Sequence, residues 1–159
     1  MTPAQLQTLK AYILSIPDLA AQPMDGDGNN NIADALNVAT VDYYVWRTSV
    51  SRADTMGDSF DWSQVDNLTV GQARIWDWLF DNGRSINPAL SSVRTGITET
   101  WKGTAAKVAV ATYVLSVCKR FASVAEKLMA VGAGTSANPS VMGFEGQITS
   151  LIVDQARHA

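Results

Sequence analysis

Thr69-Val70-Gly71-Gln72-Ala73-Arg74-Ile75-Trp76-Asp77-Trp78-Leu79-Phe80 is the stretch that decides the fold class of this chain. Its first four residues match a capping box. The Thr69 hydroxyl can accept a hydrogen bond from the Gln72 N–H, and the Gln72 side chain can reach back to the Thr69 N–H. Asn82-Gly83 then supplies a helix end. The sequence therefore predicts a helix over 69–80.

The same helix-opening signature occurs at Thr2-Pro3-Ala4-Gln5 and at Ser123-Val124-Ala125-Glu126. After the first of these, apolar residues recur on one helical face until Pro17 stops the helix. Further helices are expected over about 31–38, 87–102, 104–121 and 149–157. The helix over 104–121 is apolar around most of its circumference, which is typical of a helix buried centrally or by neighbouring subunits.

One segment does not follow the helical pattern. Val41, Tyr43 and Val45 alternate with other residues, as in a half-buried strand or small hairpin. The chain is therefore expected to be mainly α, a single-domain helical bundle of about five to seven helices with a small β element near residues 41–50. The expected order within the 1–159 domain is N-terminal helices (1–38), an extended or loop segment (39–66), a helical core (67–131), a loop (132–146) and a C-terminal helix and tail (147–159).

Composition narrows the function classes. The chain has 159 residues, 47% of them hydrophobic, a formal net charge of −3 and a pI of about 5.0. A dedicated nucleic-acid binder usually has a basic surplus, which is lacking here. No apolar run is long enough to predict a membrane-spanning helix, and no secretion signal is expected. The lone Cys118 predicts a core side chain, and His158 near the end of the sequence gives it no catalytic partner.

Motifs that could carry chemistry are weak. Residues 25–32 resemble the start of a calcium loop, but Asn30 stands where the turn needs Gly, and Leu36 where a bidentate Glu is needed. A turn that caps the next helix is favoured there. Asp54, Asp58 and Asp61 are interpreted as solvated loop acids. Gly132-Ala133-Gly134-Thr135 lacks the Lys-Ser/Thr of a phosphate loop. No catalytic, cofactor or metal site is therefore expected, and the chain is not expected to be an enzyme.

The tryptophans are more informative. Trp76 and Trp78 lie two positions apart on the expected helix, so they point about 200° apart and cannot share a face. If Trp76 joins the core, Trp78 is either covered by a second layer of the same chain or contacts another subunit. Trp46-Arg47 is a second candidate anchor, because Trp and Arg are enriched at binding hot spots.

Several short motifs, in their order and spacing, resemble a family of small proteins encoded in the structural gene clusters of tailed bacteriophages. The resemblance covers about residues 40–157. The motifs are Val45-Trp46-Arg47-Thr48, residues 68–78, Cys118-Lys119-Arg120, Ala125-Glu126-Lys127-Leu128, Gly132-Ala133-Gly134-Thr135 and Val141-Met142-Gly143-Phe144-Glu145-Gly146.

This resemblance implies a structural protein of the virion, assembled in the host cytoplasm. The functional class is a neck or head–tail connector, an adaptor that forms a homo-oligomeric ring under the portal. Its partners would be further copies of itself, the portal protein and tail or neck components. DNA would pass through the ring without specific binding.

A cyclic ring needs two complementary patches on each chain. We expect Trp46, Arg47 and Trp78 to contribute to one such patch. We expect the 132–146 loop with Phe144, and the C-terminal helix with Gln155 and Arg157, to face the portal or the neighbouring subunit. Two other functions remain open, a capsid decoration or head-stabilising protein and a host-acting phage regulator or enzyme absent from the virion.

Overall fold

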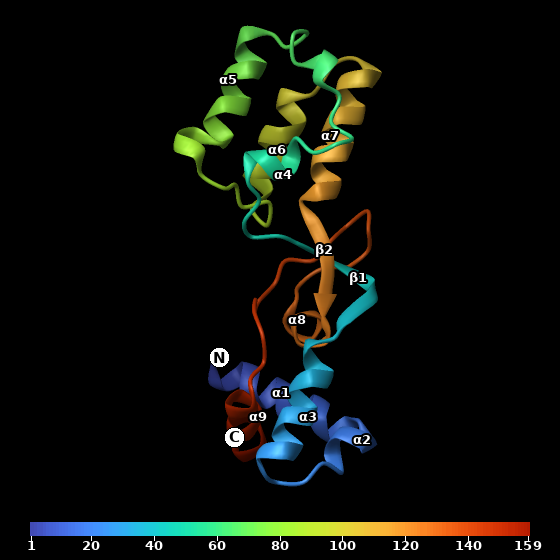
Figure 1. Cartoon of the computed structure of the whole chain (residues 1–159), viewed down its shortest axis with the longest axis vertical. Coiled ribbons are helices and arrows are strands. Elements are labelled where there is room, and N and C mark those ends of the chain that lie inside the picture. The colour runs from blue at the N-terminus through green and yellow to red at the C-terminus, as the bar shows by residue number, and fades with distance from the viewer. The chain divides into compact units, whose positions relative to one another are not determined.

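The computed structural model describes residues 1–159, except for the side chain of Asn82. Within that description the chain forms nine α-helices, two short 3-10 helices and one two-stranded sheet (Figure 1). The prediction of a mainly α chain is confirmed, but the number of helices exceeds the expected five to seven. The two additional helices, α2 (Pro17–Ala20) and α4 (Arg52–Thr55), are single turns of four residues, too short to give a periodic apolar pattern.

The three predicted capping boxes are present. They open α1 (Pro3–Ser15), α5 (Val70–Leu79) and α8 (Val124–Met129), and in each the two reciprocal hydrogen bonds are formed. A fourth capping box, in which Ser51 pairs with Asp54, opens α4.

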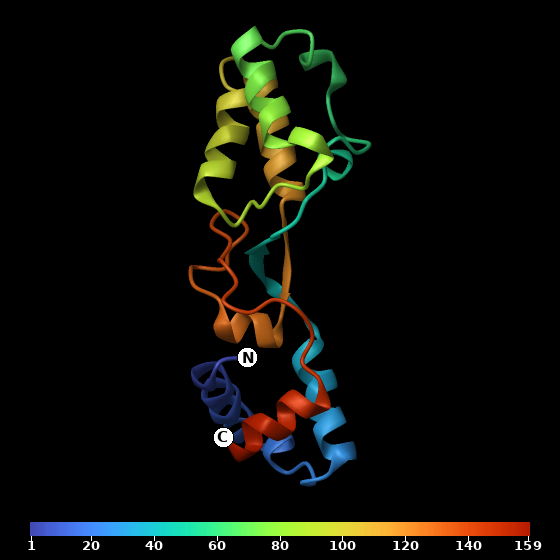
Figure 2. The ribbon, with the colours of Figure 1, turned by 90° about the vertical axis from the view of Figure 1, so that its left-hand side faces the viewer.

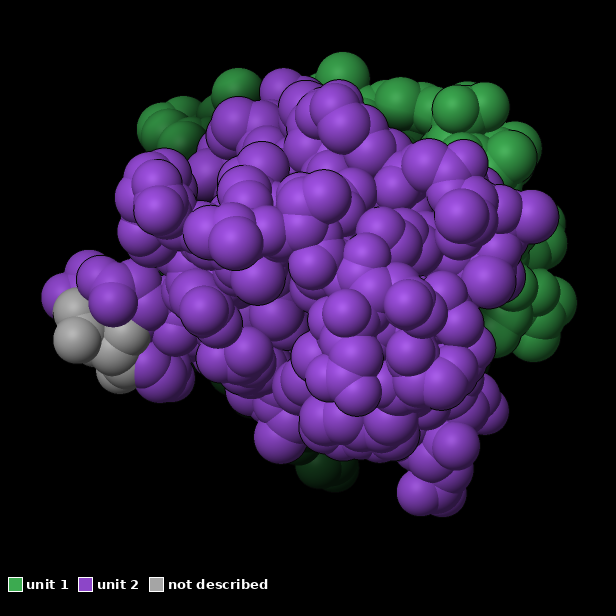
Figure 3. Space-filling view, turned by 90° about the horizontal axis from the view of Figure 1, so that it is seen from above, with its two compact units in different colours: residues 1–45, 121–159 green, residues 46–120 purple. Residues whose placement is uncertain are grey.

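The chain divides into two compact units, residues 1–45 with 121–159 (unit 1) and residues 46–120 (unit 2), which Figure 3 distinguishes by colour. Unit 1 carries three Lys or Arg and eight Asp or Glu residues, a formal charge of −5. Unit 2 carries nine and seven, a formal charge of +2. That the two units fold together as one domain stays a prediction.

Unit 1 is built mainly from α1, α3 (Gly26–Asn37), α8 and α9 (Ser150–His158), with α9 beside both α1 and α3 (Figure 2). The Asp25 carboxylate accepts a hydrogen bond from the Gly28 N–H at 2.8 Å, and residues from Gly26 onward are helical. The helix thus begins earlier than the expected 31–38. The apolar core of unit 1 consists of Leu9, Ile13, Ile32, Ala33, Leu36, Ala125, Ile148, Val153 and Ala156.

The β element lies where the sequence predicts it, but its partner is distant. Strand β1 (Ala39–Trp46) pairs antiparallel with β2 (Lys119–Ser123), not with an adjacent hairpin arm. The helix expected over 104–121 is α7 (Ala105–Val117). It ends four residues earlier than expected because the residues that follow form β2, which pairs with β1. The rings of Tyr44 and Phe121 stack across the pair with centroids 4.5 Å apart.

The 132–146 segment is a loop, as predicted, and it packs on β1. The Tyr44 N–H donates to the Gly134 carbonyl at 2.7 Å, and the Ser140 N–H donates to the Tyr44 carbonyl at 2.9 Å. Gly134 has φ +69°, and a Cβ there would lie 2.1 Å from the Tyr43 ring. Only glycine allows the loop to approach β1 this closely.

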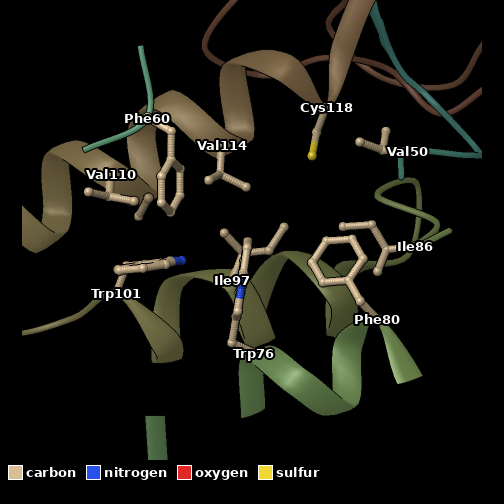
Figure 4. Close-up of a cluster of buried hydrophobic side chains, with 11 residues drawn as sticks. Val50, Phe60, Trp76, Phe80, Ile86, Ile97, Trp101, Val110, Val114 and Cys118 are labelled. Carbon is tan, nitrogen blue, oxygen red and sulfur yellow. The ribbon is translucent and has the colours of Figure 1, made fainter. Parts of the chain in front are cut away.

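Unit 2 contains α4, α5, α6 (Ser91–Thr100) and α7, with the 3-10 helices η1 (Trp62–Gln64) and η2 (Asp81–Gly83). Figure 4 shows its core side chains turned toward one another between α7 and the α5–α6 pair. They are Val50, Phe60, Trp76, Phe80, Ile86, Ile97, Trp101, Val110, Ala111, Val114 and Cys118. The helix α7 is less enclosed than its composition predicts, because Val108 is half exposed.

Candidate functional site

The candidate site is an exposed stripe on α5, formed by Val70, Arg74 and Trp78 and called here the α5 outer face. These residues are spaced i, i+4 and i+8, so they lie on one side of the helix. Val70 is 77% exposed and Trp78 is 70% exposed. The Arg74 guanidinium lies 5.9 Å from the centre of the Trp78 ring. The stripe therefore combines two apolar side chains with a cation beside an aromatic ring.

The opposite side of α5 is fixed in the core of unit 2. Trp76 is 3% exposed, and its ring meets Trp101 edge to face at 5.4 Å and Phe80 at 5.0 Å. Among the described residues, neither the Trp76 nor the Trp101 indole N–H has a hydrogen-bond partner. Burying these two donors without an acceptor costs free energy, which the packing of the rings must outweigh.

Polar contacts also hold the first turn of α5. Gln72 is buried, and its Nε2 donates to the Lys102 carbonyl at 3.1 Å. Its Oε1 accepts from the Thr69 N–H at 3.1 Å and from Lys107 Nζ at 3.2 Å. Because both the ring contacts and these bonds fix the inner side of α5, the outer face is presented on a rigid element. Such presentation lowers the entropy cost of binding.

Trp78 thus points away from Trp76, as the two-residue spacing predicts. The alternative for Trp78 was a second layer of the same chain, but the described residues leave its side chain 70% exposed. Arg74 and Val70 were not singled out from the sequence, although their i, i+4 spacing to Trp78 carries the signal. Asp77, the residue before Trp78, forms an ion pair with Arg52, in which Arg52 Nη2 lies 3.1 Å from Asp77 Oδ1.

Trp46 and Arg47 lie differently from Trp78. Trp46 is half-buried, packs against the core of unit 2 and carries the Arg94 guanidinium 4.8 Å from its ring centre. Arg47 donates to the Val117 carbonyl at 3.3 Å and forms an ion pair with Asp54 at 3.6 Å. These contacts hold unit 2 together. Their additional role in a subunit patch stays a prediction.

The three candidates in unit 1 also differ from one another. Phe144 is half-buried against the unit 1 core, whereas Gln155 is exposed on α9. Arg157 holds the turn before α3, because its guanidinium donates to the Gln22 and Pro23 carbonyls at 2.7 Å and to Asn29 Oδ1 at 2.8 Å. No residue with this anchoring role was expected from the sequence.

Replacing Arg157 with alanine is expected to lower the free energy of unfolding of unit 1 by about 2 kcal/mol, because three acceptors lose a charged donor. Arg157→Lys, the matched control, should recover less than half of that loss, since an ammonium cannot reproduce the planar fork. Urea unfolding followed by circular dichroism measures both changes. Equal stability of the alanine variant and the parent chain would show that the three hydrogen bonds of Arg157 do not stabilise unit 1.

Groups capable of chemistry are sparse in the described part of the chain. No cluster of three or more His, Cys, Asp or Glu residues with metal-site geometry occurs among the described residues. Burial raises the pKa of the Cys118 thiol to about 12, so it stays protonated near neutral pH. No described helix combines the length and apolarity needed to cross a bilayer.

The loop acids have structural partners. Backbone and side-chain hydrogen bonds from Ser51 lower the pKa of Asp54, and hydrogen bonds from Ser63 lower the pKa of Asp61. Asp54 completes the capping box of α4, and Asp61 caps η1. Both carboxylates therefore open a helical turn.

Comparison with known proteins gives no relative: no family model, no curated protein and no solved structure matches the chain.

Proposed function

We propose that the protein is a structural component of a tailed-phage particle, a head–tail connector that forms a ring of identical copies under the portal and lines the DNA exit path. It would be assembled into the virion in the host cytoplasm. The observation that carries the proposal is Trp78, an indole 70% exposed on a helix whose other face is locked into a core. The motif resemblance to phage structural proteins supplies the setting.

The apolar surface of the α5 outer face can contribute binding free energy. Burying a tryptophan removes roughly 150–250 Å² from water, worth at most about 4–6 kcal/mol. A rigid Trp beside an Arg has the composition of a binding hot spot. A protein partner that covers this face would gain that free energy without reorganising α5.

Charge supports passage of DNA without retention. The whole chain carries a formal charge of −3, so a lumen lined by many copies would not hold the phosphate backbone as a basic surface does. The proposed role requires no catalytic step, cofactor or metal.

The test uses phage heads that carry the portal but lack necks and tails. The purified protein should co-sediment with these heads, and portal-less shells should bind none of it. Equal binding to both kinds of particle would favour a decoration protein and contradict the connector role. Binding to neither would favour the host-acting alternative.

A further inference from the structure

A small pocket in unit 1 lies beside α1, between that helix and the segment joining α2 to α3. It is called here the α1 pocket and is defined by Lys10, Leu14, Met24 and Arg157. Its volume is about 170 Å³, and Leu14 and Met24 are each 64% exposed. Because these two long apolar side chains are largely exposed, a partner that covers the pocket would bury apolar surface, which favours binding.

The size of the α1 pocket selects its occupant. An apolar cavity of about 150 Å³ is large enough to take a benzene ring. The α1 pocket is therefore on the scale of one aromatic side chain and too small for a helix or strand.

The charge of the α1 pocket indicates which kind of aromatic side chain would bind there. Unit 1 has three basic residues, and two of them, Lys10 and Arg157, line this pocket. Lys10 Nζ already donates to an Ala159 oxygen at 2.6 Å, which uses one of its three N–H donors, and the Arg157 guanidinium donates to the three acceptors described above. Asp25 is adjacent to Met24 in the chain, but its carboxylate caps α3. The positive charge is local to the pocket, since unit 1 as a whole has a formal charge of −5. It favours an aromatic ring with a carboxylate next to it.

Among the described residues, three aromatic side chains are exposed: Trp62, Trp78 and Phe121. Phe121 is stacked on Tyr44. Trp78 has the Arg74 guanidinium beside its ring, which Lys10 and Arg157 would repel. Trp78 also follows an aspartate, but the Asp77 carboxylate is paired with Arg52 at 3.1 Å. Trp62 is the one that follows an aspartate, Asp61, with no ion pair among the described residues.

The surroundings of Trp62 have the required charge. Every charged residue between Arg52 and Arg74 is an aspartate, and Asp61 immediately precedes Trp62. The Trp62 side chain is 59% exposed. Its ring meets the Phe60 ring edge to face, with the two ring centres 5.1 Å apart, and the exposed part of the ring is available to a partner. The Asp61 carboxylate accepts hydrogen bonds from Ser63.

We propose that Trp62 of one copy inserts into the α1 pocket of a second copy, with Asp61 facing Lys10. This contact is heterologous, because the two copies use different surfaces, and contacts of this kind close into a ring when the rotation permits. The inference rests on the proposed function only for its setting. It leaves the α5 outer face available for a different protein of the particle.

Cross-linking between single-cysteine variants tests the contact in solution. The thiols are placed beside the contact so that Trp62 and the pocket lining stay intact: Ser59 is exposed three residues before Trp62, and Ala21 is exposed between the lining residues Ala20 and Gln22. Ser59→Cys and Ala21→Cys are purified separately, mixed and treated with a short bismaleimide. The native Cys118 is fully buried and its pKa is raised to about 12, so only the introduced thiols react. The mixture should give a covalent dimer with one copy of each variant, and each variant alone should give little.

Ser92→Cys mixed with Ala21→Cys is the matched control, since Ser92 is also an exposed serine of unit 2. The proposal is overturned if this control cross-links as well as the Ser59→Cys mixture. It is also overturned if Ser59→Cys couples mainly to itself, which would indicate a symmetric contact.

A charge exchange provides an independent readout. In the Ala21→Cys partner, Lys10→Glu should lower the yield of mixed dimer about fivefold, since exposed charge pairs contribute up to about 1 kcal/mol. Adding Asp61→Lys to the Ser59→Cys partner should restore the yield. Failure of that restoration would contradict the pairing of Asp61 with Lys10. These outcomes do not depend on the presence of the protein in virus particles, so failure of the contact and failure of the connector role are separable.

Discussion

Replacing Trp101 with alanine is expected to lower the free energy of unfolding of unit 2 by about 3–5 kcal/mol. Its side chain is fully buried and contacts both Trp76 and Phe60 edge to face, at 5.4 Å and 5.6 Å. Removing the ring leaves a cavity between α5, α6 and α7 that the neighbouring rings cannot fill. Urea unfolding measures the change, and hydrogen exchange should place the loss of protection in residues 46–120.

Trp101→Phe is the matched control for this prediction. It keeps an aromatic ring and removes an indole N–H that has no acceptor among the described residues, so the unfavourable burial of that donor disappears. The phenylalanine variant should therefore lose less than half as much stability as the alanine variant. A change below about 1 kcal/mol for Trp101→Ala would refute the assignment of Trp101 to the centre of the core.

Replacing Trp78 with alanine is expected to have the opposite pattern, a loss of binding without a loss of stability. The indole is largely exposed, so the free energy of unfolding should change by no more than about 0.5 kcal/mol. Binding to portal-bearing heads should weaken by about 2 kcal/mol or more, roughly 30-fold, if Trp78 is a hot spot. Co-sedimentation over a range of protein concentrations measures that change.

Val41→Ala provides the control, because Val41 is an exposed apolar residue of β1 in unit 1, outside the surfaces expected to contact the portal or a neighbouring copy. It should leave both the stability and the binding to heads unchanged. If Trp78→Ala binds the heads as well as the parent chain does, the α5 outer face is not the portal-facing surface.

Local sequence signals predicted the starts of α1, α5 and α8 correctly, whereas α3 begins earlier and α6 begins later than expected. A capping box is complete within four residues, so Thr2, Thr69 and Ser123 identify it without any knowledge of the fold. The box at Ser51 was overlooked because its fourth residue is Asp54, which is shorter than the usual Glu or Gln. The opposite directions of Trp76 and Trp78 also follow from helical geometry alone.

Features that depend on distant residues could not be predicted in the same way. Strand β1 was expected near its true position, but its partner β2 is more than seventy residues away, and no local pattern specifies that pairing. The environment of Trp46 depends on Arg94, which approaches it through the fold. The three hydrogen bonds of Arg157 likewise reach distant residues: two acceptors, Gln22 and Pro23, precede α3, and the third, Asn29, lies within it.

We propose that this chain works as a part of a phage particle through its exposed aromatic side chains, and quantitative mass spectrometry of purified phage particles tests this proposal. We expect the protein to be present in the copy number of a single ring, close to that of the portal protein. Absence of the protein from intact particles, with abundant protein in the infected cell, would contradict it.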